Sequence, residues 1–285
     1  MEKINFAFWG TPELASETLD MLFQCGYAPK VIVTTPDQRS GRGMHMLATP
    51  VALWAEKHNI KCLKPEKINQ EFIEEFKKLN IDLSVVVAYG KILPEILIKM
   101  PKFGTINIHY SLLPKYRGAS PVEQALLNGD AITGVCIQQM EFRLDSGAII
   151  SESEMPIGID EIKETLLKKL TGMGGKMLCD ILPRIIKKEI NPKIQNESEA
   201  TYCKKIKKED GLIDINASAM ENYNKYRAFA GWPGTYFFIN KNGRNMRVKI
   251  VKAGYEHDSF VIERVVPEGK KEINYSDFLR SNISK

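Results

Sequence analysis

The first half of the chain alternates short apolar runs with amphipathic segments, and this alternation limits the folds open to it. The run Leu83–Ala88 is continuously apolar, as expected for a strand that is covered on both faces. Similar runs predict strands at Ile4–Trp9, Val31–Thr35 and Thr105–His109. Strands that alternate with helical segments indicate βαβ units, so we predict an α/β domain with a mostly parallel sheet.

Local signals predict where the helices begin. Thr11 is expected to cap a helix that has Pro12 in its first turn. The run Ser120–Glu123 (SPVE) is typical of a capping box with proline at the first helical position. A long helix is predicted over residues 160–188. Its GMGGK segment lacks the glycine and the hydroxyl residue of a phosphate-binding loop, so we assign no nucleotide site there.

The alternation of strands and helices stops near residue 204. A lysine cluster stands there, and mainly β-strands are predicted after it. A short helix is predicted near Met220–Phe229. Strands are predicted at Tyr236–Asn240 and Arg244–Val251, joined by the strong hairpin signal Asn242-Gly243, and at Phe260–Val266. We therefore divide the chain into an α/β domain, residues 1–203, and a small β-rich domain, residues 204–285.

The composition is that of a soluble globular protein, with 44% hydrophobic and 26% charged residues among 285. The apolar runs are too short to cross a bilayer, and the N-terminus has no long apolar region of a signal peptide. The cysteines form no CxxC pair, which argues against a zinc site or a disulfide framework and for a reducing cytoplasm. They stand at Cys25, Cys62, Cys136, Cys179 and Cys203.

The net charge of +5 is concentrated at the C-terminal end. From Thr201 onward there are 16 Lys and Arg against 10 Asp and Glu, whereas the first 200 residues have 24 against 25. A basic C-terminal domain on a near-neutral body fits a polyanionic partner such as nucleic acid. The alternative is an ordinary solvated lysine-rich surface.

Three polar side chains form the candidate catalytic set. Asn107 and His109 are two residues apart on a predicted strand, so their side chains leave the same face. They lie near the carboxyl end of that strand, where open α/β sheets bind their ligands. Asp145, in the turn LDSG, supplies a carboxylate. Each residue also has a purely structural interpretation. Asn107 could be an ordinary edge residue of the sheet, His109 a surface or packing residue, and Asp145 a turn residue bonded to its own backbone.

This combination suits acyl transfer to an amine. When an amine attacks a formyl carbon, an amide N–H such as that of Asn107 can stabilise the charge on the carbonyl oxygen. His109 can accept the proton that the amine loses, and Asp145 can orient the imidazole. No serine or cysteine nucleophile is needed if the amine attacks directly.

The segments NIHYSLLPKYRGASP and LDSG closely resemble the core motif of the folate-dependent formyltransferases, and the similarity runs from Phe8 to Lys271. The resemblance implies a Rossmann-like N-terminal domain and a C-terminal barrel related to the OB-fold. It implies 10-formyltetrahydrofolate as donor, no metal, and Asn107, His109 and Asp145 as catalytic residues. The folate-binding residues it implies are Val86, Val87, Ala88, Tyr89, Gly90, Lys91, Ser111, Leu112, Leu113 and Pro114.

Within this family, the chain is most similar to the members that formylate the amino group of initiator methionyl-tRNA for translation initiation. The segment PDQRSGRG resembles the insertion loop with which these enzymes enter the acceptor stem, and we expect it to be mobile until a phosphate backbone orders it. The tRNA-binding residues implied are Arg39, Arg42, Lys204, Lys205, Lys207 and Lys208. We expect a cytoplasmic monomer without membrane contact. The alternatives are a nucleotide-sugar N-formyltransferase with the same donor and a catalytically idle RNA-binding relative.

Two departures from the family pattern stand out. Tyr110 replaces a small residue beside His109, and it is expected to narrow the pocket or to contact substrate. Few residues separate Ala253 from Phe260, where the family has a long barrel segment, so a shortened barrel is expected.

Overall fold

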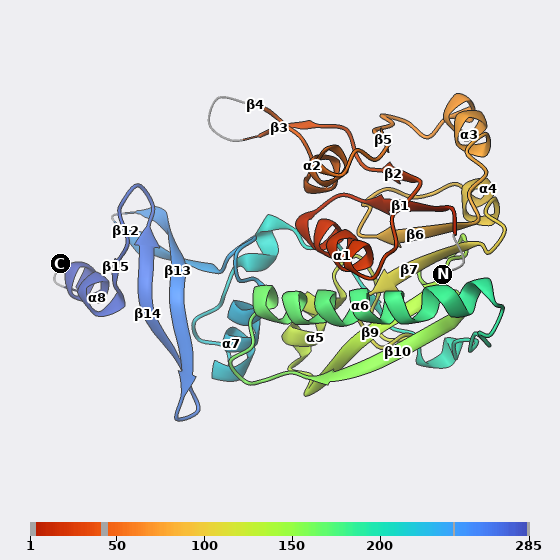
Figure 1. Cartoon of the computed structure of the whole chain (residues 1–285). Helices are drawn as coiled ribbons and strands as arrows, with labels where there is room; N and C mark the ends of the chain where they lie inside the picture. Colours follow the sequence, from red (N-terminus) through yellow and green to blue (C-terminus); the bar gives the residue numbers. More distant parts are fainter. Residues whose placement is uncertain (1–3, 41–44, 242, 284–285) are drawn as a thin grey trace. The chain divides into compact units, whose positions relative to one another are not determined.

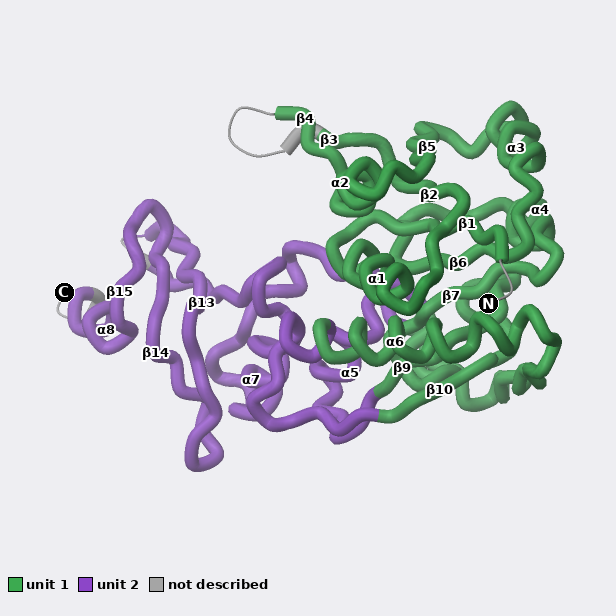
Figure 2. Tube along the Cα trace, viewed as in Figure 1, with its two compact units in different colours: residues 1–117, 134–154, 168–202 green, residues 118–133, 155–167, 203–285 purple. Residues whose placement is uncertain are grey.

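The computed structural model describes residues 4–40, 45–241 and 243–283. The chain divides into two compact units whose segments interleave along the sequence (Figure 2). Unit 1 comprises residues 1–117, 134–154 and 168–202, and unit 2 comprises residues 118–133, 155–167 and 203–285. The boundary after residue 203, which the sequence predicts, therefore stays a prediction.

Unit 1 contains the α/β sheet, with the strand order β10-β9-β7-β6-β1-β2-β5 (Figure 1). Neighbouring strands from β5 to β7 are parallel, whereas β9 pairs antiparallel with β7. The mostly parallel sheet predicted from the sequence is confirmed. Its strands are β1 (Phe6–Gly10), β2 (Val31–Val33), β5 (Cys62–Leu63), β6 (Leu83–Val87), β7 (Thr105–His109), β9 (Ile132–Gln139) and β10 (Ile149–Pro156).

Alternate strand residues point to opposite faces of the sheet, so both faces present apolar side chains against which helices pack. One core cluster joins Trp9 and its neighbours to α3 (Gln70–Lys77) and α4 (Glu95–Lys99). On β7, the side chain of Ile108 lies against Gly174 of the long helix α6 (Lys163–Ile186), where a larger residue would crowd it. The GMGGK segment is thus a helix-packing surface. Unit 1 also contains α1 (Glu13–Gln24) and α2 (Pro50–Lys57), whereas α5 (Pro121–Asn128) belongs to unit 2.

Both cap predictions for these helices are wrong. The α1 helix has Pro12 as its N-cap, without a side-chain bond, and the Thr11 hydroxyl instead donates to the carbonyl oxygen of Tyr89 at 2.9 Å. The α5 helix has Pro121 in its first turn, but the Ser120 side chain caps nothing. For Thr11, a contact distant in sequence thus replaces the local bond, whereas the distant contact of Ser120 is made by its backbone amide, which donates to Sγ of Cys203.

The cysteines also differ from the prediction. Cys25, immediately after α1, forms a disulfide with Cys179 of α6, 154 residues away, with their Cα atoms 6.3 Å apart. Spacing along the sequence cannot show a pair that only the packing of two helices brings together. Cys62, Cys136 and Cys203 are free thiols.

Unit 2 contains a four-stranded antiparallel sheet in the order β12-β13-β14-β15. The hairpin pairing of β12 (Tyr236–Lys241) with β13 (Arg244–Glu256) is confirmed, although Asn242 lies outside the described residues. A tight turn at His257 and Asp258 joins β13 directly to β14 (Ser259–Pro267), so this domain is small and β-rich, as expected. Besides α5, unit 2 contains η2 (Lys208–Gly211), α7 (Ala219–Ala228), β15 (Ile273–Asn274) and α8 (Tyr275–Ile283).

Among the described residues, no helix combines the length and the apolar character needed to span a membrane.

The core of unit 1 gives a first testable prediction. Trp9 is 1% exposed, packs against Phe72, Phe76 and Tyr89, and donates from its indole to the Ser84 hydroxyl at 3.3 Å. Trp9→Ala should lower the free energy of unfolding by about 3–5 kcal/mol, because it leaves a large cavity. Ile92, which is 85% exposed in the same unit, is the control, and Ile92→Ala should change stability by less than about 0.5 kcal/mol. Urea unfolding followed by circular dichroism measures both, and equal losses would contradict the assignment of Trp9 to the core.

Candidate active site

The chain order of the strands creates a switch point in the sheet. From β1 the chain proceeds to β2 and β5 on one side, then returns to β6 and β7 on the other side of β1. Open α/β sheets bind ligands at the carboxyl ends of the strands flanking such a point. The Thr11–Tyr89 hydrogen bond joins the two loops that leave β1 and β6 there.

His109 is the last residue of β7, and its side chain is buried. Its Nε2 lies 2.9 Å from the carbonyl oxygen of Tyr116. Because a carbonyl oxygen can only accept a hydrogen bond, Nε2 carries the hydrogen in the neutral ring. The free lone pair is then on Nδ1, which lies 3.8 Å from Oδ2 of Asp145. The structure thus brings together two of the three predicted catalytic residues, and Nδ1 is the nitrogen that can take a proton.

Asn107 lies two residues earlier on the same strand and is partly exposed. Its partner across the β7–β9 ladder is Gln138, and Cys136 faces His109 in the same way. The pairing places Asn107 and His109 on one face of the sheet, as the spacing predicts.

Gln138 is a residue of this site that the sequence did not indicate. It is fully buried, and its Nε2 donates to Oδ1 of Asp145 at 2.9 Å. Asp145 therefore presents one carboxylate oxygen to an amide and the other to the imidazole. The strand alternation around Asn107 could have pointed to Gln138, because paired residues of adjacent strands share a face.

The turn that carries Asp145 is held in an unusual backbone conformation. Asp145 has φ of 47°, a left-handed value that costs free energy for a residue with a side chain. Gly147 approaches so closely that a Cβ there would overlap the carbonyl oxygen of Gln139. The LDSG turn is thus packed tightly against the end of β9.

A second polar network lies behind this turn. Arg117 is fully buried, and its guanidinium donates to Gln195 Oε1 and to both carboxylate oxygens of Glu197. The hydrogen bond from Arg117 holds the pKa of the Glu197 carboxyl below its ordinary value. Arg143 also pairs with Glu197, at 2.7 Å. No local pattern in the sequence marks Gln195 or Glu197 as partners of Arg117.

Tyr110 does not line this site, so the expectation that it narrows the pocket or contacts substrate is wrong. As the residue after His109, it leaves the opposite face of the strand, and its buried hydroxyl lies against Thr18 of α1 and Thr171 of α6. Burial raises its pKa to about 12.

The residues expected to bind folate range from exposed to buried. Ala88 and Gly90, just after β6, are exposed and have φ of 46° and 81°. Their neighbours Val86, Val87 and Tyr89 are buried, and Tyr89 packs on Trp9. Lys91 donates to the carbonyl oxygens of Pro65 and Glu66 at 3.0 Å each.

The second segment expected to bind folate, residues 111–114, forms contacts with other protein residues. The Ser111 hydroxyl donates to the carbonyl oxygen of Lys115 at 2.6 Å. Leu112 lies against Gly134, and Leu113 packs on Cys136 and Ile149. The carbonyl oxygen of Pro114 accepts from the Thr201 amide.

The segment expected to enter the acceptor stem is only partly described. Gln38–Ser40 (β3) pairs antiparallel with His45–Leu47 (β4), so a hairpin replaces part of the irregular loop that we expected. Arg39 stands on β3, and Arg42 lies outside the described residues. In unit 2, the lysines expected to bind tRNA are exposed, and within the described part of the chain none of them forms an ion pair. They are Lys204, Lys205, Lys207 and Lys208.

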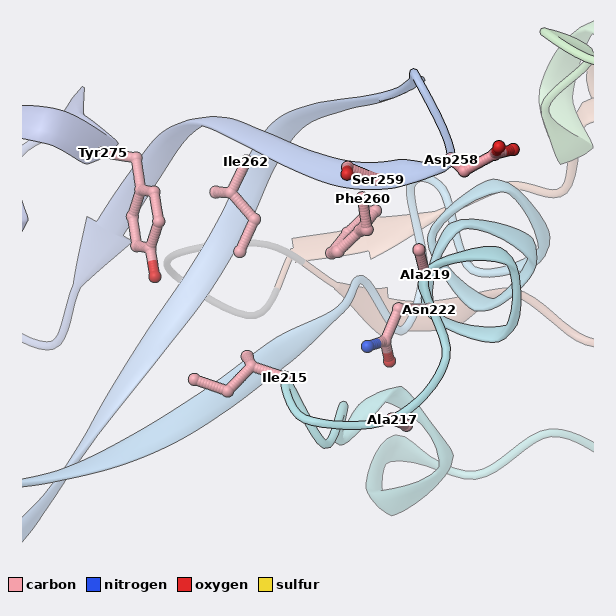
Figure 3. Close-up of a pocket in the computed structure, with 9 residues that line it drawn as sticks. All are labelled: Ile215, Ala217, Ala219, Asn222, Asp258, Ser259, Phe260, Ile262 and Tyr275. Atoms are coloured by element: carbon pink, nitrogen blue, oxygen red, sulfur yellow. The ribbon is translucent and has the colours of Figure 1, made fainter.

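The cavity shown in Figure 3 is separate from these residues. It measures about 300 Å³ and belongs wholly to unit 2, between the start of α7 and the β14 strand. None of the predicted site residues lines it. Among the described residues, no group of three His, Cys, Asp or Glu side chains is placed to hold a metal ion.

Comparison with known proteins identifies the family. Residues 2–182 match the formyl transferase family, and residues 205–260 match the C-terminal domain of formyl transferases. Methionyl-tRNA formyltransferase from a Sulfurihydrogenibium species is 45% identical over 248 residues, which cover 86% of this chain and 78% of the relative. The enzyme of the same name from Citrifermentans bemidjiense is 37% identical over 98% of this chain and 94% of the relative.

Solved structures share the fold at lower identity. An N-formyltransferase from Helicobacter canadensis, solved with folinic acid and dTDP-3-aminofucose, superposes with a TM-score of 0.65 at 20% identity, covering 95% of this chain and 98% of that one. Methionyl-tRNA formyltransferase from Clostridium thermocellum gives a TM-score of 0.61 at 16% identity over 95% and 99% of the two chains. With an α/β sheet whose strand β7 ends at His109, close to Asp145, and a family match over more than half its length, this chain belongs to the formyl transferase family.

Proposed function

We propose that the chain transfers the formyl group of 10-formyltetrahydrofolate to the amino group of initiator methionyl-tRNA. The observation that carries this proposal is the His109–Asp145 pair at the end of β7, with the proton-accepting Nδ1 directed toward the carboxylate. The name shared by the relatives at 34–45% identity supports the choice of acceptor. Such an acceptor would place the reaction in the cytoplasm.

The residues divide the chemistry among them. As the amine nitrogen bonds to the formyl carbon, the Asn107 amide donates to the carbonyl oxygen, which gains negative charge. Nδ1 of His109 takes the proton that the amine loses, and Asp145 stabilises the positive ring that results. When the bond between the formyl carbon and the folate nitrogen breaks, the same ring returns the proton to that nitrogen. Tetrahydrofolate then leaves, and no metal takes part.

The exposed backbone after β6 fits the folate donor. A pterin ring presents several hydrogen-bond donors and acceptors along one edge, and backbone groups of the exposed residues Ala88 and Gly90 can pair with such an edge. A Cβ at Gly90 would meet no atom within 4 Å, so space is open there. We propose that residues 86–91 and 111–114 hold the folate, several of them through backbone atoms or by supporting the loop.

A second candidate function, nucleotide-sugar N-formylation, differs from the first only in the acceptor. Nucleotide-sugar N-formylation needs the same donor and the same three catalytic residues, and sugar N-formyltransferases share this fold. Four exposed lysines at the start of the C-terminal segment, with no ion pair to any described residue, favour a long polyanion over a single nucleotide. We therefore propose tRNA as the acceptor and retain the amino-sugar nucleotide as the outcome that would replace it.

Asn107 tests the proposed oxyanion contact. Asn107→Ala should lower kcat about a hundredfold, or roughly 3 kcal/mol of transition-state stabilisation, because it removes the amide donor. The assay follows formyl transfer from 10-formyltetrahydrofolate to charged initiator tRNA. Asn128→Ala, at an exposed asparagine on α5, is the control and should keep wild-type turnover. Near-normal turnover by Asn107→Ala would remove this residue from the mechanism.

Metal removal tests the proposed acid–base chemistry. Titration calorimetry with a folate analogue should give the same Kd with and without a strong chelator, because the proposed contacts come from protein atoms alone. Transfer activity should also survive the chelator. Activity that is lost on chelation and restored by zinc would contradict the proposal.

The basic residues test the choice of acceptor. Replacing Lys204, Lys205, Lys207 and Lys208 by alanine should raise KM for charged tRNA and leave folate affinity unchanged. The slope of log K against log salt should fall by about 0.9 for each phosphate that the variant no longer neutralises. Alanine at Lys77 and Lys78, two exposed lysines at the end of α3, provides the matched control. Arg42→Ala should likewise raise KM for tRNA.

The same variants should be assayed with an amino-sugar nucleotide. Efficient formylation of the sugar nucleotide, no product with tRNA, and no effect of the basic residues would establish the alternative function in place of ours.

A further inference from the structure

Gln195 is a buried carboxamide whose full hydrogen-bonding capacity is taken up by the protein. Its Oε1 accepts from Nε and Nη2 of Arg117 at 3.1 and 2.8 Å. Its Nε2 donates to the carbonyl oxygens of Asp145 and Gly147 at 2.9 and 2.7 Å. A carboxamide offers two acceptor sites and two N–H donors, and all four are used. Gln195 therefore has no group left for a ligand, and its contacts can only hold protein segments together.

The two segments that it joins are those that place the catalytic pair. Arg117 directly follows Tyr116, whose carbonyl oxygen accepts from Nε2 of His109. At the other end, the bonded carbonyls belong to the turn that carries the Asp145 carboxylate. One side chain thus connects the loop that fixes the imidazole to the turn that fixes its partner.

Both segments contain a residue that needs such support. Tyr116 has φ of 60° and Asp145 has φ of 47°, and neither is a glycine. Left-handed backbone at such residues persists only where the surrounding structure over-determines it. The Thr201 hydroxyl and carbonyl hold the amides of Tyr116 and Arg117 at 2.9 Å each, so this network also fixes the strained loop from the side of residues 195–202.

We propose that Gln195 is a positioning residue for formyl transfer, which sets the separation of His109 and Asp145 by tying Arg117 to the Asp145 turn. The inference rests on the proposed function, because it assigns Gln195 a part in that reaction. The pair is separated by 3.8 Å, beyond hydrogen-bond length, so no direct bond fixes it. Displacement of a catalytic group by about 1 Å can cost on the order of a hundredfold in rate.

The test variant is Gln195→Glu. A carboxylate of the same shape still accepts from Arg117 but cannot donate to the carbonyl oxygens of Asp145 and Gly147. We expect kcat to fall on the order of tenfold to a hundredfold, with little change in KM for folate or charged tRNA, since neither substrate touches Gln195. Should this variant fail to fold, Gln195→Asn takes its place with the same expectations, because its amide is one methylene too short to bridge both segments.

A double-mutant cycle separates positioning from general damage. If Gln195 acts through Asp145, Gln195→Glu should lower kcat in the wild-type background and have no further effect in Asp145→Ala. Equal losses in both backgrounds would overturn the proposal. Asn196→Ala is the matched control: it removes the cap of the next turn, Glu197–Glu199, at an exposed position of the same segment. It should leave kcat unchanged, and a loss as large as that of Gln195→Glu at equal melting temperature would also overturn the proposal.

Two different results separate a failure of the proposed function from a failure of the positioning role of Gln195. A wild-type enzyme that formylates no methionyl-tRNA refutes the proposed function, and the positioning role in that reaction falls with it. A wild-type enzyme that is active, with Asp145→Ala inactive and Gln195→Glu at the wild-type rate, refutes the role of Gln195 alone.

Discussion

The site depends on holding an imidazole and a carboxylate from different parts of the chain at a fixed distance. His109 ends a strand in the middle of the sheet, and Asp145 lies in a turn after the next strand of the ladder. Nδ1 of His109 and Oδ2 of Asp145 are 3.8 Å apart, so their interaction is electrostatic and varies with small movements of either loop. The sheet supplies the approximate placement, because β7 and β9 are neighbours, and the final placement comes from side-chain amides behind the turn.

Two glutamines hold the carboxylate in different ways. Gln138 bonds one oxygen of the Asp145 side chain, whereas Gln195 bonds the backbone of the same turn. Both are buried, and their amides are neutral, so they fix the carboxylate without neutralising its charge. In the proposed mechanism, this charge stabilises the ring when His109 takes a proton.

Local patterns in the sequence predicted the strands of the sheet and the direction of side chains along them. The apolar run Leu83–Ala88 predicted a strand of the parallel sheet, which the structure places at Leu83–Val87. The two-residue spacing of Asn107 and His109 predicted a shared face, because strand geometry has a period of two. The resemblance to the formyltransferases supplied the family and the candidate residues, which spacing alone could not have separated from an edge asparagine and a surface histidine.

The failures share one physical cause. Thr11 bonds a loop residue 78 positions away, Cys25 pairs with Cys179, and Arg117 is bound by Gln195 and Glu197. Each contact joins residues that only the packed sheet brings together, so no window of the sequence contains both partners. Tyr110 was misassigned for a simpler reason: as the residue after His109, it must leave the opposite face of the strand.

The central claim is that His109 carries the proton between the attacking amine and the departing folate nitrogen. Single-turnover formyl transfer by His109→Ala, with and without added imidazole, tests it most directly. We expect the variant to lose on the order of a hundredfold to ten-thousandfold in rate and imidazole to restore part of the loss in proportion to its concentration. A variant that transfers the formyl group at the wild-type rate, with no response to imidazole, would contradict the account.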